Sequence, residues 1–154
     1  MLKLFTFLTT FFIILPFSFA SPCSTNLEGN TMMQYSSTNI EIDSTCSEFT
    51  IKFKNTSTVA KEYGGHNVIV SKDKDFNALT SLVDPTVHPG ENGFLPNSNK
   101  IIAKSPIIGP NESYDVKIDV SKLSSGEKYV FWCSFTGHWG VMKGNLVMKQ
   151  ESNM

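Results

Sequence analysis

Hydrophobic residues alternate with polar residues along much of the chain after residue 20. The alternation is clearest at residues 40–42, 49–53, 114–120 and 146–148. A period of two residues predicts β-strands that bury one face and expose the other. Two denser apolar runs, residues 68–70 and 128–133, predict central strands that are covered on both faces. The chain is therefore expected to fold mainly as β-sheet.

Turn-forming segments separate the predicted strands, among them Gly64-Gly65, Gly109-Pro110 and the stretch 124–126. Only residues 73–83 have a pattern that fits a short helix, and residues 84–99, rich in Pro, Gly and Asn, predict an irregular surface segment. Many short strands with one apolar face must cover that face with a second sheet. The pattern thus predicts an antiparallel two-sheet sandwich with one irregular insertion.

The first twenty residues have a different composition from the rest of the chain. Lys3 is followed by a run rich in Phe and Leu, and Ser18-Phe19-Ala20 places small residues at the spacing of a secretory cleavage site. Pro16 interrupts the run, which is short for a membrane span of roughly 20 apolar residues. We expect residues 1–20 to be a signal peptide and residues 21–154 to be one domain. An uncleaved membrane anchor is the alternative.

Charge excludes one class of partner. The chain has 154 residues with a net charge of −1, and its 13 basic residues are all lysines, set against 14 acidic residues. These charges are spread evenly, so the chain has no basic stripe of the kind that neutralises phosphates. Nucleic acid is therefore not expected as a partner.

The chain has three cysteines, an odd number for an exported protein. Cys23 and Cys46 lie in the same polar stretch, and a disulfide between them would close a loop of about 24 residues, worth on the order of 3 kcal/mol. Export leads to an oxidising compartment, where such a pair tends to form a disulfide. Cys133 is left over at the end of an apolar run. Its free thiol would be a liability there unless something holds it.

A set of soft and borderline ligands lies around this third cysteine. Cys133, His138 and Met142 fall within ten residues, and His66 precedes the strand at 68–70. Thiolate, imidazole and thioether select copper over calcium or magnesium, and two His, one Cys and a distant Met form the trigonal blue-copper set. A lone His138 would more often be a loop residue, and a lone Met142 core filler. Zinc is the main alternative ion, although zinc sites favour carboxylate over thioether.

The spacing C-x4-H-x3-M, the upstream Gly65-His66-Asn67 and the N-terminal cysteine pair resemble the azurins, a family of small cupredoxins. Residues 119–123, 126–129 and 142–146 are similar to azurins as well, so the resemblance covers essentially the whole mature chain. It implies an all-β, eight-stranded Greek-key sandwich of cupredoxin type. Residues 73–99 would form its partly helical flap.

The resemblance also implies a ligand set for one copper ion that cycles between Cu(I) and Cu(II). His66, Cys133 and His138 would be the equatorial ligands. Met142 would be a distant axial ligand, and the carbonyl oxygen of Gly65 the opposite axial contact.

Two neighbours of the ligands have implied roles. Asn67 would support the thiolate through its backbone N–H and join the two ligand loops through its side chain, and Phe135 would donate a second N–H to the sulfur. His138 would be the electron port in an apolar docking patch. The expected members of this patch are Met33, Tyr63, Phe135, Gly137, Trp139, Gly140 and Val141.

Several residues depart from the azurin pattern. Asn55 stands where many azurins carry a titrating histidine, and Val68 where some bury a tryptophan. Trp139 follows the exposed ligand where a small residue is usual, so it either shields the loop or contacts a partner. Tyr63 and Gly64 change the segment before the first ligand. His88 matches no ligand position and is interpreted as a surface residue.

The expected function follows from the enclosed ligand set. When protein fills every position of the metal, a substrate has no place to bind, so an electron carrier is expected and an enzyme is not. The resemblance implies a periplasmic monomer that meets redox proteins transiently, such as cytochrome c or copper nitrite reductase, and has no stable membrane insertion. Two alternatives remain open: a copper storage or delivery protein, and a recognition module that metal only stabilises.

Overall fold

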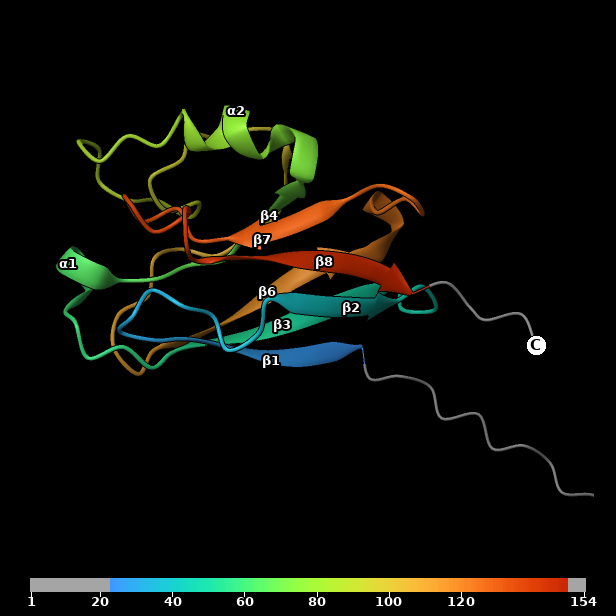
Figure 1. Cartoon of the computed structure of the whole chain (residues 1–154), viewed down its shortest axis with the longest axis horizontal. Helices are drawn as coiled ribbons and strands as arrows, with labels where there is room; N and C mark the ends of the chain where they lie inside the picture. The colour runs from blue at the N-terminus through green and yellow to red at the C-terminus, as the bar shows by residue number, and fades with distance from the viewer. Residues whose placement is uncertain (1–22, 150–154) are drawn as a thin grey trace, which may run out of the picture.

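The computed structural model describes residues 23–149, so the predicted signal peptide lies outside the described residues. Two β-sheets face one another, with a partly helical segment on one side (Figure 1). The first sheet has the order β1 (Ser24–Gly29), β3 (Glu48–Asn55), β6 (Ser113–Asp119). The second has the order β2 (Asn39–Asp43), β8 (Lys143–Lys149), β7 (Tyr129–Trp132), β4 (Ile69–Lys72), β5 (Ile101–Lys104). The eight-stranded sandwich expected from the resemblance is confirmed.

The sequence pattern predicted a fully antiparallel sandwich, but two of the strand pairs are parallel. β1 pairs with β3 in parallel, and β2 pairs with β8 in parallel. The other ladders, β3–β6, β4–β5, β4–β7 and β7–β8, are antiparallel. Tight hairpins force antiparallel pairing, whereas β2 and β8 come from distant parts of the chain and are free of that constraint.

Alternation decides which face of each strand is buried. In β3, Phe49, Ile51 and Phe53 are buried, while Lys52 and Lys54 point to the other face and are exposed. Ile51 lies opposite Val116 of β6, so the two strands present one apolar face to the second sheet. This shared core between the sheets accounts for most of the buried apolar residues. The strands predicted from a period of two are thus found where the pattern placed them.

All four residues of β7 are buried, because this strand is covered on both faces. One face meets the core between the sheets. The other lies under the flap, where η1 (Asp73–Asp75) and α2 (Phe76–Thr80) are followed by irregular chain. A second core cluster joins flap and sheet, and its buried members are Ile69, Leu79, Leu95, Val130 and Trp132. The flap thus explains the dense apolar run at residues 128–133.

Four short elements were not predicted from the sequence. Two are the edge strands β1 and β5, and two are the helical turns α1 (Lys61–Gly64) and η2 (Val120–Lys122). β1 fully buries few side chains, so its alternation is weak. Among the described residues, no helix combines the length and apolar character that a membrane crossing needs.

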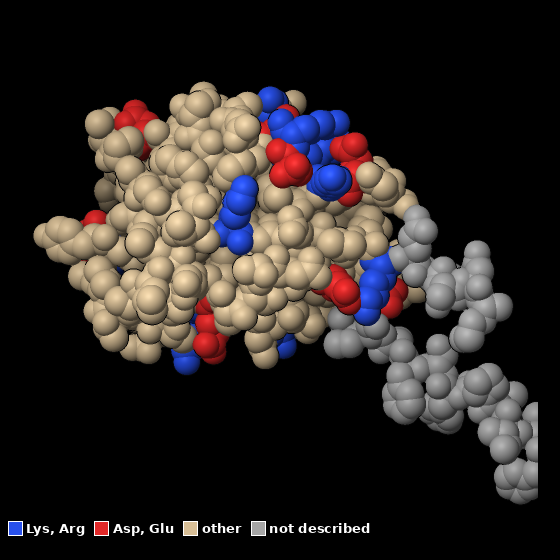
Figure 2. Space-filling model, viewed as in Figure 1, with Lys and Arg blue, Asp and Glu red and all other residues tan. Residues whose placement is uncertain are grey.

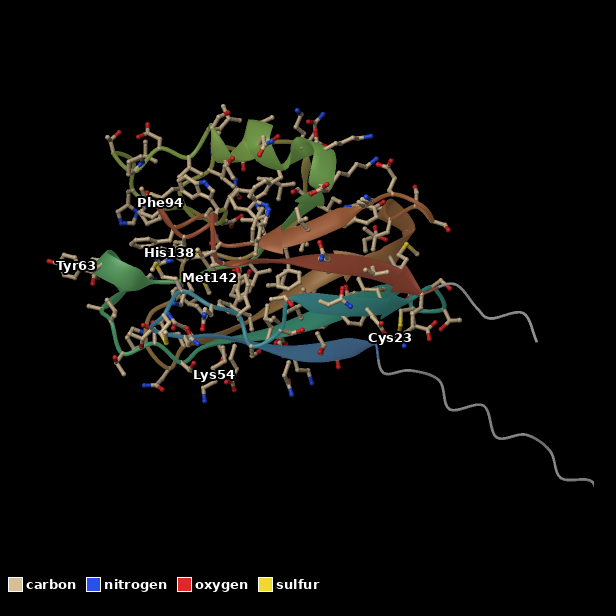
Figure 3. The ribbon with its side chains drawn as sticks, viewed as in Figure 1. Cys23, Lys54, Tyr63, Phe94, His138 and Met142 are labelled. Carbon is tan, nitrogen blue, oxygen red and sulfur yellow. A yellow bond between two sulfur atoms is a disulfide. The ribbon has the colours of Figure 1, made fainter. Side chains whose placement is uncertain are left out.

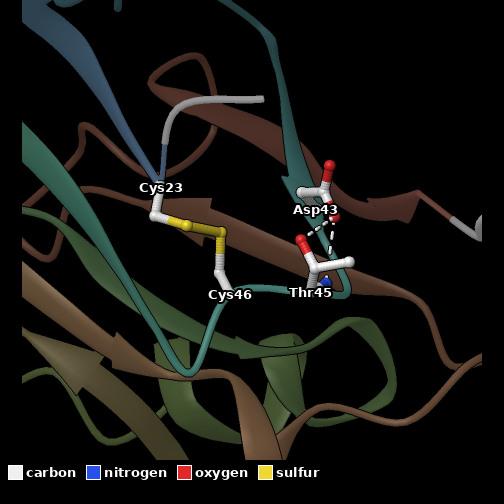
Figure 4. Close-up of a disulfide and its surroundings, with 4 residues drawn as sticks. All are labelled: Cys23, Asp43, Thr45 and Cys46. Carbon is white, nitrogen blue, oxygen red and sulfur yellow. Dashed lines mark hydrogen bonds between the residues drawn. A yellow bond between two sulfur atoms is a disulfide. The ribbon is translucent and has the colours of Figure 1, made fainter. Parts of the chain in front are cut away.

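The predicted disulfide between Cys23 and Cys46 is confirmed (Figure 4). It ties the chain just before β1 to the turn between β2 and β3, with the two Cα atoms 5.7 Å apart. Asp43 stabilises the same turn by accepting hydrogen bonds from the Thr45 backbone N–H and hydroxyl, at 2.9 and 2.6 Å. Cys23 lies at the end of the sandwich opposite His138 and Met142 (Figure 3).

Candidate metal centre

Three predicted ligands converge at one end of the sandwich. The ligand atoms of His66, Cys133 and His138 all lie within 4.8 Å of one another, and all three residues are buried. The Cys133 sulfur is 3.7 Å from Nδ1 of His138, and the two imidazole centroids are 5.1 Å apart. Met142 is fully buried beside them: a Cβ atom added to Gly29 would lie 2.7 Å from its methyl carbon and 3.1 Å from the His66 ring.

A short closed loop after β7 positions three of these four side chains. The Cys133 N–H donates to the Met142 carbonyl at 3.1 Å, which closes the loop at its base. Within it, the His138 N–H donates to the Phe135 carbonyl, and the Met142 N–H donates to the His138 carbonyl. Gly137 has a φ of +81°, a conformation that glycine adopts without steric cost. Hydrogen bonds within the loop therefore hold its conformation and bring the side chains of Cys133, His138 and Met142 together.

His66 is oriented by a backbone carbonyl. It forms an isolated antiparallel bridge with Ile108, and its Nε2 lies 2.8 Å from the Asn30 carbonyl oxygen. A carbonyl only accepts, so Nε2 carries the proton and Nδ1 holds a lone pair. Nδ1 is buried and has no hydrogen-bond partner among the described residues. Such a buried lone pair, fixed by a bond to the other ring nitrogen, is what a metal-ligating histidine requires.

Burial keeps these groups neutral in the absence of an ion. It lowers the pKa of His138 to about 4, with a further contribution from His66, and it lowers the pKa of His66 against the opposing effect of the Asn30 and Gly65 backbone. Burial also raises the pKa of the Cys133 thiol to about 12, which the Asn67 and Phe135 backbone groups offset only in part. A cation would therefore displace the thiol proton on binding.

The donor set fits copper. It offers two neutral imidazoles and one thiol, with no carboxylate in the group and the thioether of Met142 close by. Soft sulfur ligands together with imidazole are the set that suits copper, and the weak axial position is one that a thioether fills.

Asn67 joins the two segments that carry ligands. Its Oδ1 accepts from the Ser134 N–H at 2.8 Å, and its Nδ2 donates to the Ser134 hydroxyl at 3.0 Å and to the Ser105 carbonyl at 3.2 Å. The backbone groups of Asn67 and Phe135 lower the pKa of the Cys133 thiol, against the larger effect of burial, so both lie beside the sulfur. The Phe135 ring packs on His138 with centroids 4.6 Å apart.

Gly65 follows α1 directly, and its N–H donates to the Lys61 carbonyl. A Cβ at this position would lie 2.7 Å from the Lys61 carbonyl oxygen and would also collide with Ile107. Only glycine allows this close approach of backbone beside His66.

Tyr63, one of the residues predicted for the docking patch, lies at the same end of the sandwich as His138 (Figure 3). Tyr63 is 81 % exposed and Val141 64 %, and Met33 is also exposed. The charged side chains visible in Figure 2 gather mainly at the other end of that face. His138 exposes only 5 % of its surface. Trp139 is half-buried and packs against the second core cluster, as the shielding alternative requires.

The structure gives roles to the residues that depart from the azurin pattern. Asn55 is fully buried, donates to the Ile108 carbonyl at 2.8 Å and accepts from the Ser57 N–H. The same carbonyl accepts from the backbone N–H of His66, so Asn55 and His66 share one hydrogen-bond acceptor. Val68 is part of the core. His88 is exposed in the flap, outside the site.

Sequence reasoning missed several residues that support the site. Asn30 supplies the carbonyl that orients His66, and its side chain also accepts from the N–H groups of Met32 and Gln34. Ser105 and Ser134 supply the partners of Asn67. Asn30 itself was a usable signal for a turn, but nothing in the sequence indicated which side chain its carbonyl would meet.

Comparison with known proteins gives concordant results. Residues 21–149 match the model of the family described as "copper binding proteins, plastocyanin/azurin family". The chain is 42 % identical to an azurin of Alcaligenes faecalis over 130 residues, 80 % of this chain and 96 % of the relative. It is 34 % identical to an azurin of Pseudomonas aeruginosa over 131 residues, 84 % of this chain and 87 % of the relative.

A solved structure is similar as well. The azurin Az-iso2 of Methylomonas sp. strain J superposes with a TM-score of 0.76 at 33 % identity, covering 84 % of this chain and all of the other. The donor set found in the structure agrees with these matches, and copper is the cofactor that both indicate. The fold, the converging ligands and the matches together show that the chain belongs to the plastocyanin/azurin family of copper-binding proteins.

Proposed function

We propose that this protein, an electron-transfer cupredoxin by family, shuttles single electrons between redox partners outside the cytoplasm. His66, Cys133 and His138 are proposed as the equatorial copper ligands. Met142 and the Gly65 carbonyl are proposed as the axial contacts. The observation that carries the proposal is the buried convergence of two imidazoles and one thiol within 4.8 Å, beside a buried thioether.

The chain's own contribution is a fixed and dry donor set. Bound copper supplies a one-electron couple. The closed loop after β7 and the Asn30–His66 hydrogen bond hold the donors in one arrangement, which favours small reorganisation when the charge changes. A cavity of about 510 Å³ beside Phe135 is lined by residues of the flap, of α1 and of the segment after β5, and by none of the four ligand side chains. This arrangement supports a carrier over an enzyme and over a storage protein with an exchangeable site.

The exposed apolar end of the sandwich is proposed as the docking surface. His138 reaches solvent only through a small part of its ring, so a partner must come close to it to exchange electrons. Tyr63 and Val141 offer apolar contact area there. Small, weak interfaces suit transient redox encounters. A c-type cytochrome or a copper nitrite reductase is the proposed kind of partner, met by a monomer in the periplasm after removal of residues 1–20.

The first test is an optical titration of the metal-free mature protein with cupric ion. An intense blue absorption that bleaches on reduction is expected. Its absence from a protein shown to contain one copper ion would contradict the proposal.

The second test is the rate of electron exchange with a purified c-type cytochrome. Val141→Glu places a charge in the docking surface and should slow the exchange. Val147→Glu makes the same change on the exposed side of β8, away from this end, and should leave the rate unchanged. Equal rates in the two variants would contradict the docking surface and leave the copper site untouched.

A further inference from the structure

The Tyr35 side chain links the core between the sheets to the metal centre. Its ring is buried and packs edge-on against Phe53, with centroids 6.0 Å apart, and at a tilt against Phe131, at 5.2 Å. Its hydroxyl donates to the backbone carbonyl of Asn67 at 2.5 Å. Burial raises the pKa of the phenol well above its usual value, so the hydroxyl keeps its proton and acts as a donor. A rigid ring thus aims one donor at a single carbonyl.

The carbonyl that Tyr35 binds belongs to a peptide outside the sheet ladders. Asn67 and Val68 precede β4, and the N–H on the other side of this peptide, that of Val68, donates to the Ser105 hydroxyl at 2.9 Å. Both polar groups of the Asn67–Val68 peptide are therefore held by side-chain hydroxyls. The orientation of this peptide depends on those two side chains.

That orientation matters for the sulfur. The peptide plane after Asn67 is linked through a single Cα to the Asn67 N–H, the backbone group that lowers the pKa of the Cys133 thiol. We expect a change in the direction of the carbonyl to turn the Asn67 backbone and to move its N–H relative to the sulfur. The Asn67 side chain fixes the other end of the same residue on Ser134.

We propose that Tyr35 is a positioning residue of the metal centre: its hydroxyl holds the Asn67 carbonyl so that the Asn67 N–H stays on the Cys133 sulfur. The inference rests on the proposed function of the site. A hydrogen bond to the sulfur draws electron density from it and favours the reduced state, and such bonds tune the potential of blue-copper sites. Loss of the Tyr35 hydroxyl should therefore weaken that bond and lower the reduction potential.

The test compares two phenol-to-phenyl changes. Tyr35→Phe removes the hydroxyl and keeps the ring in the core. The matched control is Tyr129→Phe, because Tyr129 is equally buried and its hydroxyl also bonds to backbone, accepting from the Ser124 N–H at 2.7 Å. Tyr129 lies four residues before Cys133 along β7, roughly 13 Å away at the rise of a strand. Both variants lose one hydrogen bond between a tyrosine hydroxyl and the backbone, but only the bond of Tyr35 lies at the metal centre.

Four readouts are compared. In the metal-free protein, the Asn67 amide proton should exchange with solvent faster in Tyr35→Phe than in the wild type, and at the wild-type rate in Tyr129→Phe. In the copper-loaded protein, Tyr35→Phe should have a lower midpoint potential and a higher copper–sulfur stretching frequency, while both properties stay unchanged in Tyr129→Phe. Thermal unfolding should shift to lower temperature in both variants.

The outcomes separate the inference from the function on which it rests. If Tyr35→Phe loses thermal stability but keeps the wild-type potential, stretching frequency and Asn67 exchange, Tyr35 is only a core residue and the inference is overturned. A wild-type protein that fails to turn blue with copper would instead overturn the proposed function. The faster Asn67 exchange in the metal-free variant would support the positioning role even then.

Discussion

Removal of the Asn67 side chain should destabilise the metal-free protein, because several buried hydrogen bonds are lost at once. Asn67→Ala leaves the buried N–H of Ser134 without its acceptor and takes one donor from the Ser105 carbonyl. An orphaned buried donor costs about 1–3 kcal/mol and a lost hydrogen bond about 0.5–1.5 kcal/mol. With a small cavity in place of the amide, we expect the free energy of unfolding to fall by about 3 kcal/mol.

Urea denaturation of the metal-free protein, followed by tryptophan fluorescence, measures this loss. Asn26→Ala removes an amide from an exposed position on β1 and serves as the control. It should change the free energy of unfolding by less than about 0.5 kcal/mol. A loss below about 1 kcal/mol in Asn67→Ala would refute the reasoning, because it would mean that Ser134 and Ser105 find other partners without cost.

Four further predictions concern the copper site and the disulfide. Cys133→Ser should abolish the blue absorption and leave the circular dichroism of the sheets unchanged, because the thiolate is the charge-transfer donor; a blue variant would contradict the assignment. Met142→Leu should keep most of the colour and shift the midpoint potential in voltammetry, and loss of copper would contradict a weak axial ligand. Replacing both Cys23 and Cys46 by Ser should lower the free energy of unfolding in urea by about 3 kcal/mol without changing the visible spectrum, and a changed spectrum would show that the two ends of the sandwich are coupled. The reduction potential of the wild type should stay constant from pH 5 to 8, because Asn55 does not titrate. In Asn55→His, the potential should rise as the pH falls, because a protonated ring favours the reduced ion. A pH-dependent potential in the wild type would contradict this role of Asn55.

Much of the fold was predictable from the sequence because burial follows the alternation of residues. Phe49, Ile51 and Phe53 show the pattern and form one face of β3. β1 escaped notice because, as an edge strand, it fully buries few side chains. The parallel pairing of β2 with β8 was missed for another reason: alternation indicates which face is buried, but carries no information on which strand lies alongside.

The candidate site also has a part that the sequence predicted and a part that it did not. The Cys133–Met142 spacing is local, so one short stretch of sequence suggested three donors together. The supporting contacts are not local: the Tyr35 hydroxyl meets a carbonyl 32 residues away, and Asn67 meets Ser134 67 residues away. Such partners depend on how the sheets stack, and a carbonyl acceptor leaves no trace in the amino-acid type. Trp139 was difficult for a related reason, since only the position of the flap decides how much of the indole is covered.

The parallel pair of β2 and β8 has a consequence for biogenesis. β2 ends at residue 43, yet its neighbour in the sheet is β8, at residues 143–149. A nascent chain therefore cannot complete the five-stranded sheet until β8 has been synthesised, and pairing over such a separation is intrinsically slow. Late completion of the sheet would keep the chain unfolded for the export that we propose.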